Sequence, residues 1–263
     1  MINAQDQQSS PQMMTRPQPD SVLWGAVLLA FIILAGLSVA RYQGYNTGMY
    51  DLGNMSQAIW SVTQGQPLLY SRPEGFAASR LAGHVELGYM AIAPLYALWP
   101  DPRVLLIVQA GLFAFGAVGA YRLTLRRTES RFAARCIALI YLFYPTALTS
   151  VLFDFHADTL VLPLLMLALD ALDERAWRRY ALLIVLALSL KFYVAIAVAG
   201  IGFVAFTWGG QRRVGTITIV LALAYGAFAF FVIRPLFAET HVGGVAKITT
   251  RYTSSYLGAV GEL

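Results

Sequence analysis

The chain has 263 residues, of which 58% are hydrophobic and 13% are charged. Soluble domains usually carry about 25% charged residues, so this chain has too few charges to cover a water-facing surface, and a soluble globular protein is excluded. The formal net charge is +5, but the arginines cluster in short gaps between apolar runs. That pattern is typical of membrane topology and not of a nucleic-acid-binding face. The sequence therefore predicts an all-α, polytopic transmembrane helix bundle in contact with the lipid bilayer, and no nucleic acid partner is expected.

The first crossing is predicted shortly after the N-terminus. Residues 1–21 are rich in Gln, Pro and Ser and should form a disordered cytoplasmic tail. Val22 to Ala40 then contains no charge and, as a helix, spans about 28 Å, enough for one crossing. Asp20 stands where an N-cap is expected. Residues 41–80 are polar and aromatic, so we expect an outer loop long enough to carry short surface helices.

The apolar stretch after this loop is interrupted. Only 13 uncharged residues separate Glu86 from Pro100, and Pro94 lies among them. Such a segment is too short for a crossing and contains a helix breaker, so a partial helix on the outer side is predicted. Val104 to Leu125 forms the next crossing and brings the arginines that follow it to the cytoplasm.

The rest of the chain is divided by the same charge argument. A single helix over residues 176–208 would place Arg212 and Arg213 outside, so two short helices meeting at Lys191 are preferred. The total is about seven crossings plus the partial helix, all within one transmembrane module at residues 22–237. Residues 238–263 are expected to be an outer-side tail or the start of a missing C-terminal half. The crossings after Leu125 are predicted at residues 136–153, 159–172, 176–208 (two) and 214–233.

Under this topology, a set of ionisable residues converges on the outer side. If the outer loop folds back over the bundle, the carboxylate of Asp51 can come close to those of Asp154 and Asp158. Such carboxylates can bind a divalent cation, or one of them can deprotonate an acceptor. Structural explanations stay open, because the acids can cap turns or helices and the histidines can be hydrogen-bonded structural residues. The residues of this set are Asp51, His84, Glu86, Asp154, His156, Asp158 and Lys191.

Lys191 is the least easily explained of these residues. An ammonium group among apolar neighbours is expensive inside a membrane, so we expect it to pair with Glu86, Asp154 or Asp158, or with a phosphate. Asp170 has a simpler explanation, since it lies near the cytoplasmic arginines and should pair with them.

Several segments together resemble a family of bacterial membrane proteins, DUF2079, which is related to the GT-C glycosyltransferases. The resemblance covers about residues 45 to 260, and its most specific part is the Phe153 to His156 motif together with the Tyr50 to Trp60 pattern. It is carried by Tyr50-Asp51-Leu52-Gly53, Gln57-Ala58-Ile59-Trp60, Gly83-His84, Ala93-Pro94-Leu95-Tyr96-Ala97-Leu98-Trp99-Pro100, Leu152-Phe153-Asp154-Phe155-His156 and Lys191.

The resemblance implies a GT-C-like N-terminal module in the bacterial inner membrane that takes a sugar from a polyprenyl-phosphate carrier on the outer face. Asp51 and Asp154 would be catalytic, and Lys191 with His84 would lie near the carrier phosphate. A divalent cation, Mg²⁺ or Mn²⁺, would be held by Asp154, Asp158 and His156.

The alternative is a noncatalytic integral subunit of a larger membrane complex, derived from such an enzyme. It is suggested by Phe192 and Tyr193, which follow Lys191 where the family usually has an acidic pair. The partners would then be other membrane protein subunits.

Overall fold

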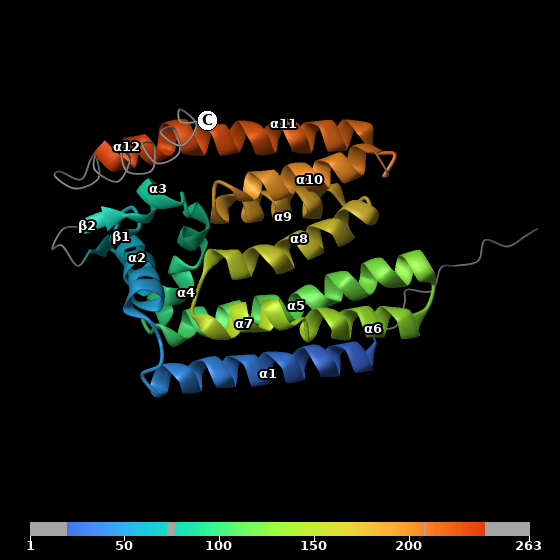
Figure 1. Ribbon diagram of the computed structural model, residues 1–263, viewed down its shortest axis with the longest axis horizontal. Coiled ribbons are helices and arrows are strands. Elements are labelled where there is room, and N and C mark those ends of the chain that lie inside the picture. The colour runs from blue at the N-terminus through green and yellow to red at the C-terminus, as the bar shows by residue number, and fades with distance from the viewer. Residues whose placement is uncertain (1–19, 73–76, 208, 240–263) are drawn as a thin grey trace, which may run out of the picture.

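A computed structural model describes residues 20–72, 77–207 and 209–239. It is mostly helical, and Figure 1 shows long helices lying roughly side by side with the short elements gathered at one end. The tails predicted for residues 1–21 and 238–263 lie almost entirely outside the described residues. The elements in chain order are α1 (Ser21–Gln43), η1 (Met49–Gly53), α2 (Asn54–Thr63), β1 (Leu69–Ser71), β2 (Ala77–Ser79), α3 (Arg80–Gly83), η2 (Leu87–Ala91), α4 (Ala93–Leu98), α5 (Arg103–Thr128), α6 (Arg131–Leu142), α7 (Pro145–Phe153), α8 (Ala157–Asp173), α9 (Trp177–Leu190), α10 (Val194–Thr207), α11 (Arg212–Phe228), η3 (Ala229–Ile233) and α12 (Arg234–Glu239).

Three helical segments are long and apolar enough to cross a membrane: Ser21–Gln43, Arg103–Thr128 and Arg212–Ala238. The pair α6 and α7 passes the same test as one unit bent by 44°, which makes a fourth. Helices α8, α9 and α10 have 17, 14 and 14 residues and are shorter than a full span. The chain is thus a multi-pass membrane protein with three or four candidate spans among the described residues, and the predicted total of about seven is not shown.

The bend between α6 and α7 was not predicted, because residues 136–153 read as a single crossing. Its cause is Pro145 at the start of α7. Proline lacks the N–H that a continuous helix needs, and it forces the preceding residue away from the helical region. Tyr144 accordingly has ψ 114°, and the helix direction changes there.

The predicted break at Lys191 is confirmed. Helix α9 ends at Leu190 and α10 begins at Val194, while Lys191 itself is extended, with φ −155° and ψ 145°. One freed backbone group is satisfied by another segment, since the Phe192 N–H donates to the His84 carbonyl oxygen at 3.1 Å. A broken helix in a membrane protein needs such protein partners.

The helices stack as a series of neighbours. Figure 1 shows α1 on one side and α11 on the other, with α5, α8 and α10 between them. The apolar stretch of α5 is 72% buried, against 22% for α1 and 17% for the span that α11 begins, so α5 is the most buried of the three long candidate spans. Helices α10 and α11 approach each other closely: a Cβ added at Gly215 would lie 2.6 Å from the Gly202 carbonyl oxygen.

The segments between α1 and α5 form the short elements at one end of the bundle. The predicted partial helix at residues 81–100 consists of α3, η2 and α4, with four, five and six residues, and none of them is a candidate span. The antiparallel pair β1 and β2, in which Tyr70 faces Ala78, was not predicted. We call this end of the molecule the loop end.

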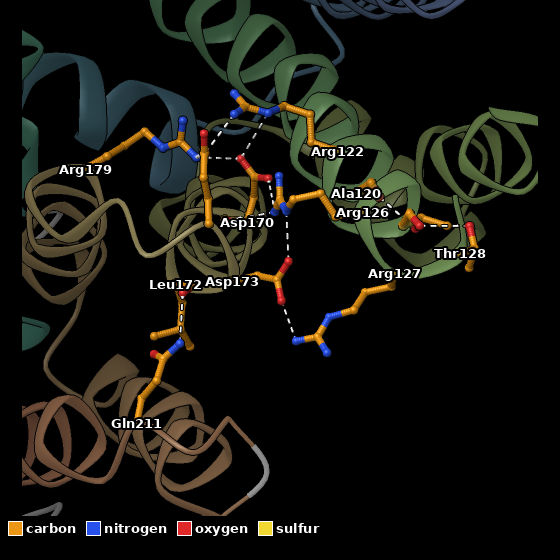
Figure 2. A network of polar contacts seen from close by, with 12 residues as sticks. Ala120, Arg122, Arg126, Arg127, Thr128, Asp170, Leu172, Asp173, Arg179 and Gln211 are labelled. Atoms are coloured by element: carbon orange, nitrogen blue, oxygen red, sulfur yellow. Dashed lines mark hydrogen bonds and ion pairs between the residues drawn. The ribbon is translucent and has the colours of Figure 1, made fainter. Parts of the chain in front are cut away.

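The opposite end holds most of the arginines, and we call it the arginine end. Asp170 of α8 is almost fully buried there and pairs with Arg126 at 2.6 Å, Arg179 at 2.8 Å and Arg122 at 3.6 Å (Figure 2). The predicted pairing of Asp170 with nearby arginines is confirmed. Residues of the arginine end are Arg122, Arg126, Arg127, Arg131, Arg135, Arg175, Arg178, Arg179, Arg212 and Arg213.

The first residues of α1 are fixed at the arginine end by Asp20. Its carboxylate accepts from the backbone N–H groups of Val22 and Leu23 at 3.1 and 3.2 Å, which confirms the predicted N-cap. It also accepts from the Tyr121 hydroxyl at 2.7 Å and from Arg135 Nε at 3.0 Å. Burial alone would raise the pKa of Asp20, but these hydrogen bonds outweigh it and lower the pKa to about 2.

Candidate functional site

Asp154 is the buried carboxylate at the loop end. It follows α7 in an extended conformation, with φ −152° and ψ −171°, and its side chain is 2% exposed. Oδ2 accepts from the Gly48 N–H at 2.8 Å, and Oδ1 lies 3.7 Å from Arg41 Nη2 without any hydrogen-bond partner among the described residues. Burial raises the pKa of Asp154, against the opposing effects of the Gly48 N–H and Arg41.

Asp51 of η1 lies next to Asp154, although the two are far apart in the sequence. A methyl group added at Gly48 would lie 3.2 Å from Asp154 Oδ2 and 3.5 Å from Asp51 Oδ2, so both carboxylates face the same small space. Asp51 Oδ1 is 3.2 Å from His156 Nε2, and the Asp51 side chain is 35% exposed. The structure thus joins one buried and one accessible carboxylate with an imidazole.

Gln109 of α5 fixes the position of this group and was missed by the sequence analysis. Its fully buried carboxamide donates to the carbonyl oxygens of Val151 and Asp154, at 3.0 and 2.9 Å, and accepts from the His156 N–H at 3.0 Å. It therefore holds the segment between α7 and α8 on both sides of Asp154. The available signal was a lone amide in the apolar first half of the predicted crossing Val104 to Leu125, where polar groups need partners.

Lys191 belongs to a second group at the loop end. Its ammonium donates to Asp158 Oδ2 at 2.5 Å, and the Tyr193 hydroxyl donates to Asp158 Oδ1 at 2.6 Å. The Lys191 side chain is 8% exposed and that of Asp158 is 51% exposed. The expected pairing of Lys191 with a nearby acid is confirmed, and Asp158 is the partner. Tyr193 was not identified from the sequence, where only its place two residues after Lys191 was a signal.

A third group contains Glu86 and His84. Glu86 is fully buried and accepts from Arg80 Nε at 2.5 Å, while its Oε1 has no hydrogen-bond partner among the described residues. The His84 ring meets Tyr193 edge-on at a centroid distance of 6.3 Å. Burial lowers the pKa of His84; Glu86 opposes this, and Lys191 adds to it. His84 therefore lies beside the Lys191 group and not beside Asp51.

The predicted metal trio is not gathered in one place. Asp154 contacts Gly48 and Arg41, His156 contacts Asp51, and Asp158 pairs with Lys191. Residues 20–72, 77–207 and 209–239 contain no group of three or more His, Cys, Asp or Glu side chains that could hold a metal ion. What the structure offers instead is a pair of carboxylates, Asp51 and Asp154.

A cavity of about 410 Å³ lies at the segment that follows α1. Its walls include Tyr42, Gln43, Tyr45 and Thr47, which lie between Arg41 and Gly48 in the sequence.

The sequence profile of a family described as "Predicted membrane protein (DUF2079)" matches residues 41–263. No curated protein and no solved structure matches the chain. Because the profile covers most of the chain, the protein belongs to this family. The family description gives a membrane location and no activity.

Proposed function

We propose that this member of the DUF2079 family is a GT-C-like glycosyltransferase that uses a polyprenyl-phosphate-linked sugar. The observation that carries the proposal is the juxtaposition of buried Asp154 with accessible Asp51 at the loop end. A buried carboxylate without full hydrogen bonding costs folding energy, and such residues concentrate at functional sites.

The proposal requires the loop end to face outward. In the proposed topology α8, α9 and α10 are short crossings, which gives about seven in all and leaves the arginine end in the cytoplasm. The test replaces Cys136 by serine and introduces single cysteines at Tyr45, which is 96% exposed, and at exposed Glu129 of the arginine end. In intact cells an impermeant thiol reagent should label position 45 and not position 129, and the opposite result would reverse the topology.

In the proposed reaction Asp51 is the general base. It accepts the proton of the acceptor hydroxyl, whose oxygen forms a bond to the anomeric carbon of the sugar. The bond from that carbon to the phosphate oxygen breaks, and its electron pair leaves with the carrier phosphate. His156, 3.2 Å from Asp51, orients the carboxylate, and Gln109 holds the His156 backbone.

A divalent cation fits the carboxylate pair. Asp154 Oδ1 is buried without a hydrogen-bond partner among the described residues, and two carboxylates leave room for further oxygen ligands. Asp154 would hold Mg²⁺ or Mn²⁺, with His156 and the basic carboxylate of Asp51 beside it. When bound, such a cation compensates negative charge on a leaving phosphate. Asp158 is a weaker candidate ligand, since Lys191 and Tyr193 already occupy both its oxygens.

Lys191 and His84 would lie beside the carrier phosphate. The exposed Asp158 carboxylate neutralises Lys191, so the phosphate must share the ammonium or displace Asp158. Lys191 is therefore proposed as a residue that binds the carrier and not as a group that participates in proton transfer.

The test measures binding and transfer separately. The full chain is purified in detergent, and copurifying polyprenyl phosphate is identified by mass spectrometry. Transfer from labelled polyprenyl-phosphate sugars is then followed for wild type, Asp51→Asn and Asp154→Asn, with Glu129→Gln at the arginine end as the matched control. We expect all four proteins to retain the carrier and the two site variants to lose at least 100-fold in transfer. Absence of carrier from the wild type would contradict the proposal.

A second candidate function is a noncatalytic subunit of a membrane complex. The observation that favours it is the ion pair between Lys191 and Asp158, which leaves no free ammonium for a phosphate. Native copurification distinguishes the two: a stoichiometric partner chain, retained by the Asp51→Asn variant, together with absence of carrier lipid would support the subunit.

A further inference from the structure

We propose that the arginine end carries a binding surface for the headgroup of an anionic phospholipid, formed by Arg175, Arg178, Arg212 and Arg213. This surface lies at the end opposite the candidate site and does not depend on the proposed activity. It is called the four-arginine surface below.

Apart from Arg131 and Arg135 of α6, the arginines of this end fall into two sets. The first set, the α5 arginines of this end and Arg179 of α9, forms ion pairs within the protein with Asp170 and Asp173 of α8 (Figure 2) and with Glu174, which follows α8. The four arginines of the proposed surface are exposed, and within the described residues they have no acidic partner. Their charges are therefore available to a ligand from outside the chain.

Two turns form the surface, and the protein ties them together. Arg175 and Arg178 belong to the turn from α8 to α9, while Arg212 and Arg213 begin α11. Gln211 Nε2 donates to the Leu172 carbonyl oxygen at 3.3 Å, which joins the second turn to the first (Figure 2). Arg175 is held in the left-handed region with φ 56°, a conformation that costs energy for a residue with a side chain. The four arginines thus lie on two neighbouring turns that this hydrogen bond holds together.

The local electrostatics favour an anion. Arg178 and Arg212 lie in the first turns of α9 and α11, neither of which contains an acid. The start of a helix is its positive end, so cations there are unfavourable unless an anion compensates them. The proposal rests on the charges of the four arginines, and the two helix N-termini add to the same positive potential.

A lipid headgroup is the anion that fits this location. The surface lies at the end of several membrane-spanning helices, where lipid phosphates are concentrated, and exposed Trp177 stands between Arg175 and Arg178. Tryptophan prefers the membrane interface, and arginine binds phosphate through paired N–H donors. Basic residues near a membrane surface select anionic over zwitterionic lipids.

The test compares two lipids on the full chain. The protein is reconstituted in nanodiscs of mixed phosphatidylglycerol and phosphatidylcholine, and the lipids it retains are counted by native mass spectrometry. The double variant Arg212→Gln/Arg213→Gln removes half of the surface, and Arg175→Gln/Arg178→Gln removes the other half. The control, Arg127→Gln/Arg131→Gln, removes the same charge from the turn between α5 and α6.

We expect wild type to retain phosphatidylglycerol selectively, and each surface variant to lose about thirtyfold in its association, about fivefold per arginine. The control should change less than threefold. Unchanged thermal unfolding shows that the surface variants still fold. An equal loss in the control would mean diffuse attraction and would overturn the proposal, as would equal retention of phosphatidylcholine. Displacement of the lipid by millimolar inorganic phosphate would instead identify a soluble-anion site and would also overturn it.

Discussion

Replacing Gln109 by leucine tests whether the segment between α7 and α8 is held by one side chain. Leucine has nearly the same volume and suits the surrounding helices, so the substitution removes three hydrogen bonds without a large cavity. It leaves the carbonyl oxygens of Val151 and Asp154 and the His156 N–H without this partner. Each buried group left unpaired costs about 1–3 kcal/mol, so the free energy of unfolding should fall by at least about 3 kcal/mol.

The assay is thermal or chemical unfolding of the purified protein in detergent, followed by circular dichroism. Gln43→Leu is the matched control, since it makes the same change at an exposed residue at the end of α1 and should stay within about 0.5 kcal/mol of wild type. A loss of less than 1 kcal/mol for Gln109→Leu, equal to that of the control, would refute the reasoning that Gln109 fixes this segment.

Four further predictions follow from single contacts. Gly215→Ala should lower the unfolding free energy by about 1–3 kcal/mol, because its Cβ would meet the backbone of α10 at 2.6 Å, whereas Gly200→Ala, with nothing within 4 Å, should be neutral or slightly stabilising in the same unfolding assay. Asp20→Asn should flatten the decrease in unfolding free energy at acid pH. Because the pKa of Asp20 is lowered, its carboxylate contributes stability above pH of about 3.9, the ordinary pKa of an aspartate, and this stability is lost as the pH falls towards about 2. Identical acid profiles for both proteins would contradict this. Asp154→Asn should be as stable as wild type or more stable at pH 7, because burial raises the pKa of Asp154 and its carboxylate form therefore destabilises the fold as pH rises. The difference in stability should vanish below about pH 4. A large loss of melting temperature at pH 7 would refute this expectation. Lys191→Met should insert normally, since it removes an insertion cost and leaves an exposed Asp158, and should weaken retention of polyprenyl phosphate, measured by lipid mass spectrometry.

Much of the helical arrangement could be predicted because a membrane imposes simple rules. The charge-free run after Asp20 predicted α1, and the need to keep Arg212 and Arg213 with the other arginines predicted the break at Lys191. The bend at Pro145 was missed because hydropathy averages over a proline that only shifts the helix direction. The pair of strands was missed because three-residue strands leave almost no periodic pattern.

The candidate site was only partly predictable for a different reason. Topology placed the acids on one side of the membrane, but which acid meets which depends on the three-dimensional path of the loop. The resemblance placed Asp154, Asp158 and His156 around one cation, yet the backbone at Asp154 is extended and the two acids have different partners. Asp158 joins Lys191, and Asp154 joins Asp51 across the fold. The sequence marked Gln109 as a lone amide in an apolar run, but its partners could not be predicted because they are backbone groups, which every residue has.

The two helices that meet at Lys191 have a consequence for the surrounding bilayer. Each has 14 residues and is about 21 Å long, against about 30 Å of hydrocarbon. A pair that enters from the arginine end therefore stops about 9 Å below the opposite headgroups. Such hydrophobic mismatch is relieved when the adjacent leaflet thins or water fills the gap. At Lys191 itself the gap is filled by protein, since the His84 carbonyl oxygen accepts from the Phe192 N–H and the Lys191 side chain is 8% exposed, so the thinning would affect the lipid around the two helices.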